Sequence, residues 1–178
     1  MISDFVKGKK QYDFSAGIQK GIRLHRAIDE FTDIHPSTKQ LKEFFRPDYR
    51  LYSGAFADVA YDHFLANDKN EFASTSALKG FSASVYMILD GHLELLPAGF
   101  QRLFSYMRSQ DWLSNYGEPW LIERSFLGLE RRATYLEESG IAFKIFSENV
   151  EAIRSCYDSF FPDLKAFATH KLQVLLNS

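Results

Sequence analysis

Residues 16–33 read AGIQKGIRLHRAIDEFTD and are followed closely by Pro36. Residues of this stretch that are separated alternately by four and three positions fall on one face of an α-helix. They are Ile18, Ile22, His25, Asp29 and Thr32. Because a proline disfavours the helical conformation in the residue before it, we expect the helix to stop before His35. The stretch therefore predicts an amphipathic helix that carries two titratable side chains on its apolar, core-facing side.

The rest of the chain also divides into helical blocks, and no alternation of apolar and polar residues is long enough to predict a strand. Pro36 is expected to open a second helix that ends at a polar turn at residues 46–48. Further helices are expected at residues 53–66, 74–96, 97–116, 119–135, 141–161 and 162–176. Three of them would have a proline in the first turn, where its missing N–H costs little. We predict an all-α fold, with one domain at residues 1–178 that forms a compact bundle of about seven helices.

The composition excludes several classes of protein. Hydrophobic residues make up 46% of the 178 residues and charged residues 25%, a balance typical of globular domains rather than disordered chains. A formal net charge of −2 argues against nucleic acid as a partner, since such proteins usually present a cationic surface. Neither a membrane span nor a secretion signal is visible in the sequence. Because the single cysteine, Cys156, cannot form an intramolecular disulfide, we expect a cytoplasmic protein.

His25 and Asp29 are the first candidates for chemistry. Their i,i+4 spacing brings the two side chains together on a helix, and such a pair can direct two ligands at one metal ion. An unpaired carboxylate in an apolar surrounding is costly, so both groups need partners. A histidine held in the core by its neighbouring aspartate is the alternative explanation of the same pair.

A second group of such residues lies in the predicted helix at residues 53–66: Asp58, Asp62 and His63. The two aspartates fall on one helical face, and the histidine lies about a quarter-turn away at the edge of the apolar stripe. Asp4 adds a carboxylate near the N-terminus. Two imidazoles and up to four carboxylates suit a divalent ion such as Mn²⁺, Mg²⁺ or Fe²⁺. We therefore predict a metal site, and the choice among these ions stays open.

Three segments of the chain carry a resemblance to a known family: DFVKG at residues 4–8, GIRLHRAID at residues 21–29 and YDHFL at residues 61–65. They resemble the acyl carrier protein phosphodiesterase family, and weaker likenesses continue through nearly the whole chain. The resemblance implies an all-helical domain similar to the HD-type metal-dependent phosphohydrolases. It also implies the activity, which is hydrolysis of the phosphodiester that joins the 4′-phosphopantetheine arm to holo acyl carrier protein.

The resemblance implies roles for single residues at the matching positions. Asp4, His25, Asp62 and His63 are expected to bind the metal, with manganese favoured. Asp29 and Asp58 are expected to be further ligands or to orient the ligands, and Asp29 is counted with the four ligands among the catalytic residues. Lys7 and Arg26 are expected to pair with phosphate oxygens, although solvated or helix-pairing charges explain both cations equally well.

The resemblance also implies a protein partner. Acyl carrier proteins are acidic, so we expect a cationic docking surface that includes Lys9, Lys10, Lys20 and Arg23. Ordinary solvation of helix surfaces is the alternative explanation for these charges.

Family members usually carry a stretch resembling Asn-Phe-Leu-Ala-His-Leu ahead of the DFVKG motif, whereas this chain starts at the motif. We expect either a start assigned too late or a natural short form that lacks a helix and one histidine. An apolar face exposed by that difference would favour a homodimer. Two other functions remain open: a non-catalytic helical protein that binds an acidic partner, and an HD-like hydrolase of another phosphoester such as a nucleotide.

Overall fold

The computed structural model describes residues 2–131 and 140–178, and these residues form helices and loops without a strand. Their α-helices are α1 (Ala16–Ile34), α2 (Pro36–Tyr49), α3 (Ser53–Ala66), α4 (Thr75–Asp90), α5 (Ala98–Ser109), α6 (Trp112–Asn115), α7 (Pro119–Glu130), α8 (Ile141–Glu148) and α9 (Val150–Leu176). Four short 3₁₀ segments accompany them: η1 (Ser3–Phe5), η2 (Gly8–Asp13), η3 (Arg50–Tyr52) and η4 (Leu93–Leu95). The predicted all-α class is confirmed.

The first three helices follow the sequence pattern closely. α1 stops at Ile34 because His35, the residue before Pro36, takes an extended backbone with ψ of 136°. Pro36 opens α2 as predicted, and the His35 ring accepts a hydrogen bond from the backbone N–H of Ser37 at 3.2 Å. This side chain therefore satisfies one of the free N–H groups at the start of α2. α3 has the predicted bounds.

Two predicted boundaries at prolines are wrong. Pro47 lies inside α2, which continues to Tyr49, and Pro162 lies inside α9. A proline within a helix costs about 3 kcal/mol, because it removes a hydrogen bond and crowds the preceding turn. Buried side chains on both sides of Pro162, such as Phe160 and Leu175, each contribute about 1.5–3 kcal/mol and offset that cost. The break near the C-terminus comes instead at Asn149, between α8 and α9.

Three other predicted helices are shorter than expected. The predicted helix at 74–96 ends at Asp90, and the one at 97–116 is divided between α5 and α6. At the division Asp111 adopts a left-handed φ of 44°, and its carboxylate accepts a hydrogen bond from Ser82 of α4 at 2.8 Å. This turn depends on a contact with another helix, which a local pattern does not reveal. α7 ends at Glu130, and residues 132–135 of the predicted helix lie outside the described residues.

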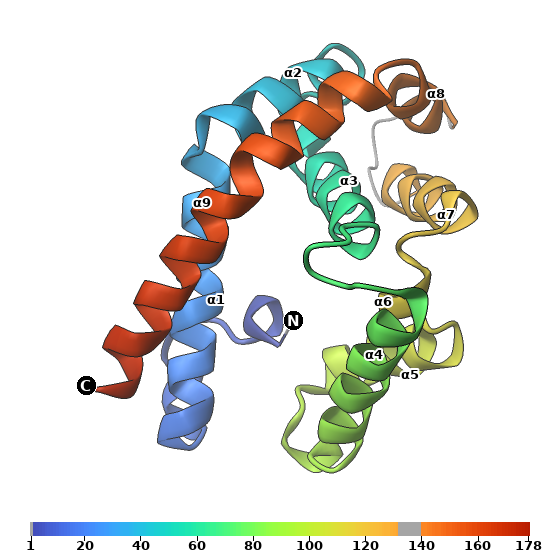
Figure 1. Ribbon diagram of the computed structural model, residues 1–178. Helices are drawn as coiled ribbons and strands as arrows, with labels where there is room; N and C mark the ends of the chain where they lie inside the picture. The colour runs from blue at the N-terminus through green and yellow to red at the C-terminus, as the bar shows by residue number, and fades with distance from the viewer. Residues whose placement is uncertain (1, 132–139) are drawn as a thin grey trace.

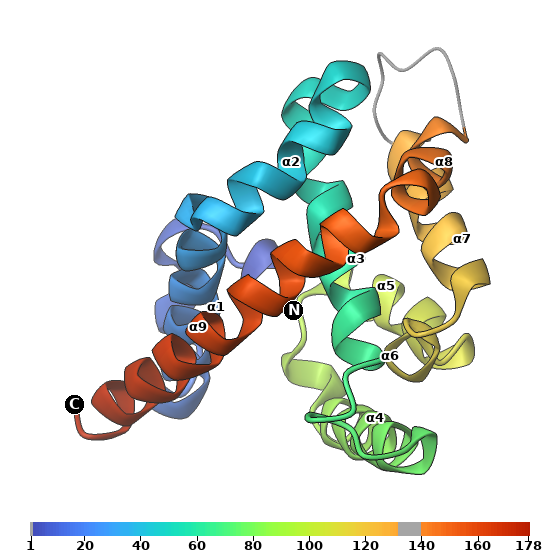
Figure 2. The same ribbon diagram turned by 45° about the horizontal axis from the view of Figure 1, so that its top comes forward.

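The helices form two limbs (Figures 1 and 2). In both views α1, α2 and α9 lie together along one limb, and α4, α5 and α6 form the other. α3 lies between the limbs, and α7 and α8 pack at the end where α2, α3 and α9 meet. The N-terminal segment with η1 and η2 lies beside α1 and faces the second limb.

Each limb contributes to its own apolar cluster. The larger cluster joins α2, α3, α7, α8 and α9, and its centre contains the contacting rings of Phe45, Phe56 and Phe126. The smaller one contains Phe100 and Phe104 of α5 together with Tyr86, Leu96 and Met107. Among the described residues no helix is long and apolar enough to cross a membrane. The space between the two clusters holds the candidate site.

Candidate metal site

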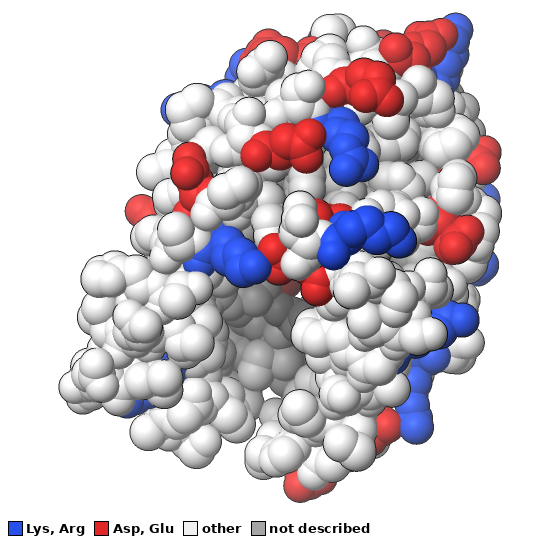
Figure 3. All heavy atoms as spheres, in the orientation of Figure 1, with Lys and Arg blue, Asp and Glu red and all other residues white. Residues whose placement is uncertain are grey.

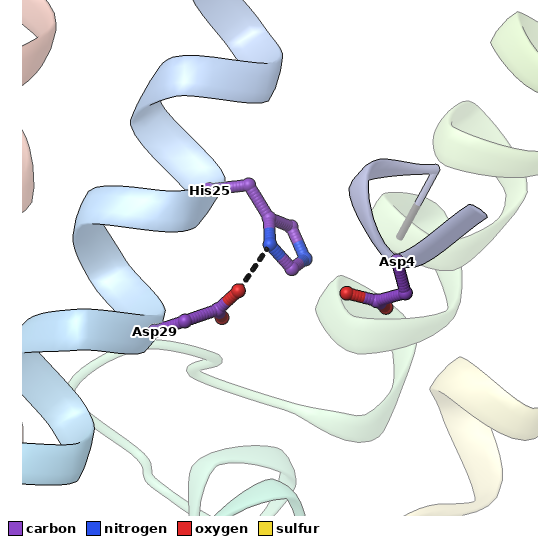
Figure 4. Close-up of side chains that lie close together, drawn as sticks. All are labelled: Asp4, His25 and Asp29. Carbon is purple, nitrogen blue, oxygen red and sulfur yellow. Dashed lines mark hydrogen bonds and ion pairs between the residues drawn. The ribbon is translucent and has the colours of Figure 1, made fainter. Parts of the chain in front are cut away.

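Three side chains from η1 and α1 converge: Asp4, His25 and Asp29 (Figure 4). One ligand atom from each, a carboxylate oxygen or a ring nitrogen, lies within 4.8 Å of the other two. His25 and Asp29 come from successive turns of α1, as their spacing predicted, and Asp4 approaches from η1. The expectation that this face packs into the core is confirmed for Ile22, which is buried, but is wrong for His25 and Asp29. The side chains of His25 and Asp29 are 34% and 52% exposed, because the face opens onto a pocket.

Asp29 holds the His25 ring in place. The Nδ1 atom of His25 donates a hydrogen bond to the carboxylate of Asp29 at 2.9 Å. The second ring nitrogen, Nε2, is on the side of the ring that faces Asp4 in Figure 4. Histidines that bind metals usually donate the other ring N–H to a carboxylate or a carbonyl, which fixes the tautomer and the ring orientation. The arrangement suits Nε2 as the ligand atom, with Asp29 as the residue that orients it.

Phe5 anchors the segment that carries Asp4. Its ring packs edge-on against Phe100 of α5, with ring centroids 5.6 Å apart. A Cβ atom at Gly99 would lie 2.9 Å from the Phe5 ring, so the absence of a side chain at Gly99 allows this approach. Asp4 is thereby held at the mouth of the pocket by its neighbour in the chain.

Arg26 anchors the same segment from α1. Its guanidinium donates hydrogen bonds to the backbone oxygen of Val6 at 2.7 Å and to the side chain of Gln11 at 3.0 Å. The sequence predicted that Arg26 and Lys7 pair with phosphate. In the structure the Arg26 guanidinium is engaged by these two partners, and Lys7 is an exposed residue at the start of η2. Neither side chain lines the pocket that contains Asp4.

The pocket has a volume of about 710 Å³ and two chemically different walls. One wall carries five aspartates from η1, α1 and α3: Asp4, Asp29, Asp33, Asp58 and Asp62. The other comes from α4, α5, α6 and the loop before α4, and it includes Phe72, Phe81, Phe100, Met107, Trp112 and Tyr116. Figure 3 shows the molecule hollowed between two lobes, with acidic side chains at the upper edge of the hollow and basic ones on either side.

Asp58 and Asp62 of α3 have raised pKa values. Both residues are exposed on α3, and the walls of the pocket keep part of the water away from their carboxyl groups. This partial removal from water raises the pKa of Asp62 from 3.8 to about 7, and the charge of Asp58 adds to the rise. For Asp58 the same burial, followed by the charge of Asp33, raises the pKa to about 6, while Lys42 acts in the opposite direction. The pocket therefore contains more negative charge than its surroundings readily stabilise.

His63 lies apart from the cluster. Its Nδ1 atom donates a hydrogen bond to the backbone oxygen of Tyr116 at 2.9 Å, and its ring packs edge-on against Phe64 and Phe146. Burial lowers the pKa of His63, so the neutral ring is favoured. The structure thus does not bring His25 and His63 together at one metal. The reason is the quarter-turn between Asp62 and His63 on α3: Asp62 faces the pocket, whereas His63 faces α6 and α8.

The cations expected to bind the partner protein come from η2 and α1. Lys9 and Lys10 are exposed on η2, and Arg23 is exposed on α1. The Nζ atom of Lys20 donates a hydrogen bond to the backbone oxygen of Leu176 at the end of α9, at 3.3 Å. Their role in binding a partner stays a prediction.

The three converging residues suit a divalent cation. The carboxylate of Asp4 and the Nε2 atom of His25 are donors that suit Mn²⁺, Mg²⁺ and Fe²⁺, and Asp29 orients the ring. Ligand atoms on opposite sides of such an ion lie up to about 4.4 Å apart, so a spread of 4.8 Å requires only small side-chain rotations. Asp62 lines the same pocket but is not part of the three-residue group.

Comparison with known proteins decides the family. The profile described as "Acyl carrier protein phosphodiesterase" matches residues 1–164. The chain belongs to the acyl carrier protein phosphodiesterase family. The protein of that name from Yersinia pestis is 30% identical over 171 residues, which are 96% of this chain and 89% of the relative. Those from Yersinia enterocolitica and Escherichia coli are 29% and 27% identical over the same shares.

Membership in the acyl carrier protein phosphodiesterase family makes the chain an enzyme of the phosphoric diester hydrolase class. No solved structure matches the chain, so the likeness to HD domains stays a prediction.

Two parts of the pocket were missed by the sequence argument. Asp33 follows Asp29 by four residues and belongs to the same face of α1, so the helical spacing could have identified it. The aromatic wall unites Phe72 and Phe81 with Trp112 and Tyr116. Residue spacing along one helix cannot predict that Phe72 and Phe81 lie near Trp112 and Tyr116, since the two sets come from different elements.

Proposed function

We propose that this protein is a metal-dependent phosphodiesterase that releases the 4′-phosphopantetheine arm from holo acyl carrier protein. The name of the family and of the matching relatives supports this substrate. The convergence of Asp4, His25 and Asp29 supports the dependence on a metal.

One observation carries the proposal: the pocket that would receive an anionic phosphodiester is lined by five aspartates. Negative carboxylates repel a phosphate group, and the repulsion is strong where water is partly excluded. The Nζ atom of Lys42 lies 2.7 Å from a carboxylate oxygen of Asp33, so the charge of this lysine is already paired. A divalent cation in the cluster reverses the local charge, so cation and phosphate can bind to this wall together.

Four of the five aspartates of the acidic wall have a role in this proposal, together with His25. Asp4 and Nε2 of His25 hold the cation, and Asp29 orients the His25 ring. Asp62 and Asp58 face the same pocket from α3 and are the candidates for further ligands. Because a nearby positive charge favours ionised carboxylates, binding of the cation lowers the raised pKa values of both groups.

A divalent cation held there would lower the pKa of a water molecule and offset negative charge on the phosphoryl oxygens. In the reaction, a water oxygen bonds to phosphorus, and the bond from phosphorus to the serine oxygen of the carrier protein breaks. The serine oxygen takes up a proton. The phosphate leaves with the arm.

The experiment is mass spectrometry of intact holo carrier protein after incubation with the enzyme. The enzyme is first stripped of metal and then supplied with Mn²⁺, Mg²⁺ or Fe²⁺. We expect a loss of mass equal to that of the arm, dependent on the metal and abolished in His25→Ala and Asp4→Asn. Asp13→Asn is the matched control, because Asp13 is an exposed aspartate of η2 outside the pocket.

An unchanged mass with all three ions would overturn the proposal. Turnover of a nucleotide or another phosphoester under the same conditions would then identify a different hydrolase. Tight binding of the carrier protein without any turnover would instead identify a non-catalytic binding protein.

A further inference from the structure

The two substituents of the scissile phosphate need different spaces. In the proposed reaction, one substituent is a slender arm and the other is a folded carrier protein. A volume of about 710 Å³ is that of a small-molecule site and cannot enclose a protein domain. The arm alone can enter such a space, and the carrier protein has to stay outside it.

Two hollows next to His25 are candidates for the arm. One is the pocket with the acidic and aromatic walls. The other is a groove of about 630 Å³ between the first half of α1 and the end of α4, whose walls include Ile18, Ile22, Ile88 and Leu95. Asp4, His25 and Asp29 all line the pocket, whereas only His25 lines the groove. A phosphate bound to a cation at these three residues therefore directs the arm into the pocket.

The chemistry of the walls favours the same choice. The arm contains two amide groups, which lose hydrogen bonds to water when they are placed against aliphatic side chains. The groove is lined mainly by aliphatic side chains. The pocket instead offers aromatic rings and Tyr116, whose hydroxyl group lies close enough to Asp62 for the charge of that carboxylate to act on it. Burial raises the pKa of this hydroxyl above its usual range, so it remains a neutral hydrogen-bond donor.

Four aromatic residues belong to the aromatic wall, and two of them are in ring contact. Phe72 and Phe81 lie with ring centroids 5.5 Å apart, and Phe81 remains 51% exposed. Trp112 and Tyr116 are only partly buried, and the Trp112 indole donates a hydrogen bond to Gln110 at 3.1 Å. Rings that are fixed on one side and open on the other provide rigid apolar contact area for a ligand.

We infer that the aromatic wall formed by Phe72, Phe81, Trp112 and Tyr116 binds the pantetheine arm, with the carrier protein outside the pocket. The inference rests on the proposed function, since that function supplies the substrate. It adds the part of the site that recognises the arm and distinguishes it from other phosphodiesters.

Tryptophan fluorescence tests the contact directly, without turnover. The chain has two tryptophans, Trp112 in the wall and Trp120 on α7 outside the pocket. Trp120→Phe leaves Trp112 as the reporter, and Trp112→Phe leaves the matched control. We expect titration with 4′-phosphopantetheine in the presence of Mg²⁺ to change the emission of Trp120→Phe saturably. The emission of Trp112→Phe should stay constant.

Two exposed positions distinguish the pocket from the groove. Phe81 and Ile88 are 51% and 59% exposed, so truncation of either leaves the core packing intact. Phe81→Ala should raise KM for holo carrier protein by about tenfold, the effect of losing one aromatic contact. Ile88→Ala should keep the KM of the original protein, and circular dichroism verifies that both variants are folded.

The outcomes separate this inference from the proposed function. If holo carrier protein is turned over, but the Trp112 emission does not change and Phe81→Ala keeps the original KM, the inference is overturned and the proposed function stands. A raised KM in Ile88→Ala together with a normal one in Phe81→Ala places the arm in the groove and also overturns it. A saturable response of Trp112 without turnover of holo carrier protein supports the arm site and overturns the proposed activity.

Discussion

The Nδ1 atom of His25 and the carboxylate of Asp29 lie 2.9 Å apart across one turn of α1. This hydrogen bond determines which nitrogen of the ring is available to a ligand. In the proposed metal site the two residues therefore have unequal parts, since His25 presents a donor atom and Asp29 orients it.

Asp29→Asn should weaken Mn²⁺ binding by about 10–100-fold, the range found when a residue that orients a metal-binding histidine is replaced. The asparagine can still accept a hydrogen bond from Nδ1 but lacks the negative charge that raises the basicity of the ring. Isothermal titration calorimetry measures the affinity, with Asp13→Asn as the control. Wild-type affinity in Asp29→Asn would contradict the role of Asp29.

Arg26→Ala should also weaken metal binding, although Arg26 is not part of the cluster. The variant loses the hydrogen bonds to Val6 and Gln11, so the segment that carries Asp4 is freed from α1. We expect a loss of Mn²⁺ affinity together with faster proteolysis near the N-terminus. Arg23→Ala removes an exposed arginine from the same helix and serves as the control.

The competing explanation predicts a different result. If Arg26 pairs with phosphate, Arg26→Ala raises KM for the substrate while Mn²⁺ affinity and proteolysis stay as in the control. That result would support the assignment made from the sequence.

The sequence predicted those parts of the fold that depend on local pattern. The bounds of α1 and α3 follow from apolar spacing and from Pro36, and both are confirmed. The errors occur where packing outweighs local preference. Pro47 and Pro162 remain inside helices because buried neighbours stabilise the turns around them.

The candidate site was predictable in the same sense. His25 and Asp29 lie on one helix, so their spacing was enough to join them. The position of His63 depends on which neighbours surround α3, and this is set by how α6, α7 and α8 pack. The position of Asp4 near His25 likewise depends on the anchors Phe5 and Arg26, whose partners are distant in the sequence. Asp4 was counted among the candidate carboxylates, but no spacing joined it to His25, and its role as a ligand came from the resemblance to the family.

The raised pKa values of Asp58 and Asp62 predict how stability changes with pH. Between about pH 4 and pH 7 the folded, metal-free protein retains protons on these groups that the unfolded chain has released. The stability that these two protonated carboxyl groups give the folded protein is therefore fully present below pH 4. It is lost as the pH rises through 6 and 7. His63 acts in the opposite direction. Its pKa is lowered in the folded state, so its contribution to stability grows as the pH rises toward 6.5.

A double variant isolates the two aspartates from His63. We expect the melting temperature of metal-free Asp58→Asn/Asp62→Asn, relative to that of the original protein, to rise between pH 5 and pH 8. Saturating Mn²⁺ should reduce this difference, because the cation stabilises the ionised carboxylates. Thermal melts with EDTA and with Mn²⁺ measure both effects. A difference that is constant with pH would show that the two groups titrate normally in the folded protein.

The two histidines predicted as ligands should respond to substitution in opposite ways. His63→Ala removes the hydrogen bond to the backbone oxygen of Tyr116 and the ring between Phe64 and Phe146. An acceptor left without its partner costs about 1–3 kcal/mol, so the melting temperature should fall while the folded protein binds Mn²⁺ with unchanged stoichiometry. His25→Ala should lose the metal with a smaller change in the melting temperature of the metal-free protein, because this side chain is 34% exposed. Calorimetric unfolding and metal analysis on the same samples measure both quantities. Loss of Mn²⁺ from His63→Ala at an unchanged melting temperature would mean that His63 is a ligand after all, and that α3 turns toward the cluster when the metal binds.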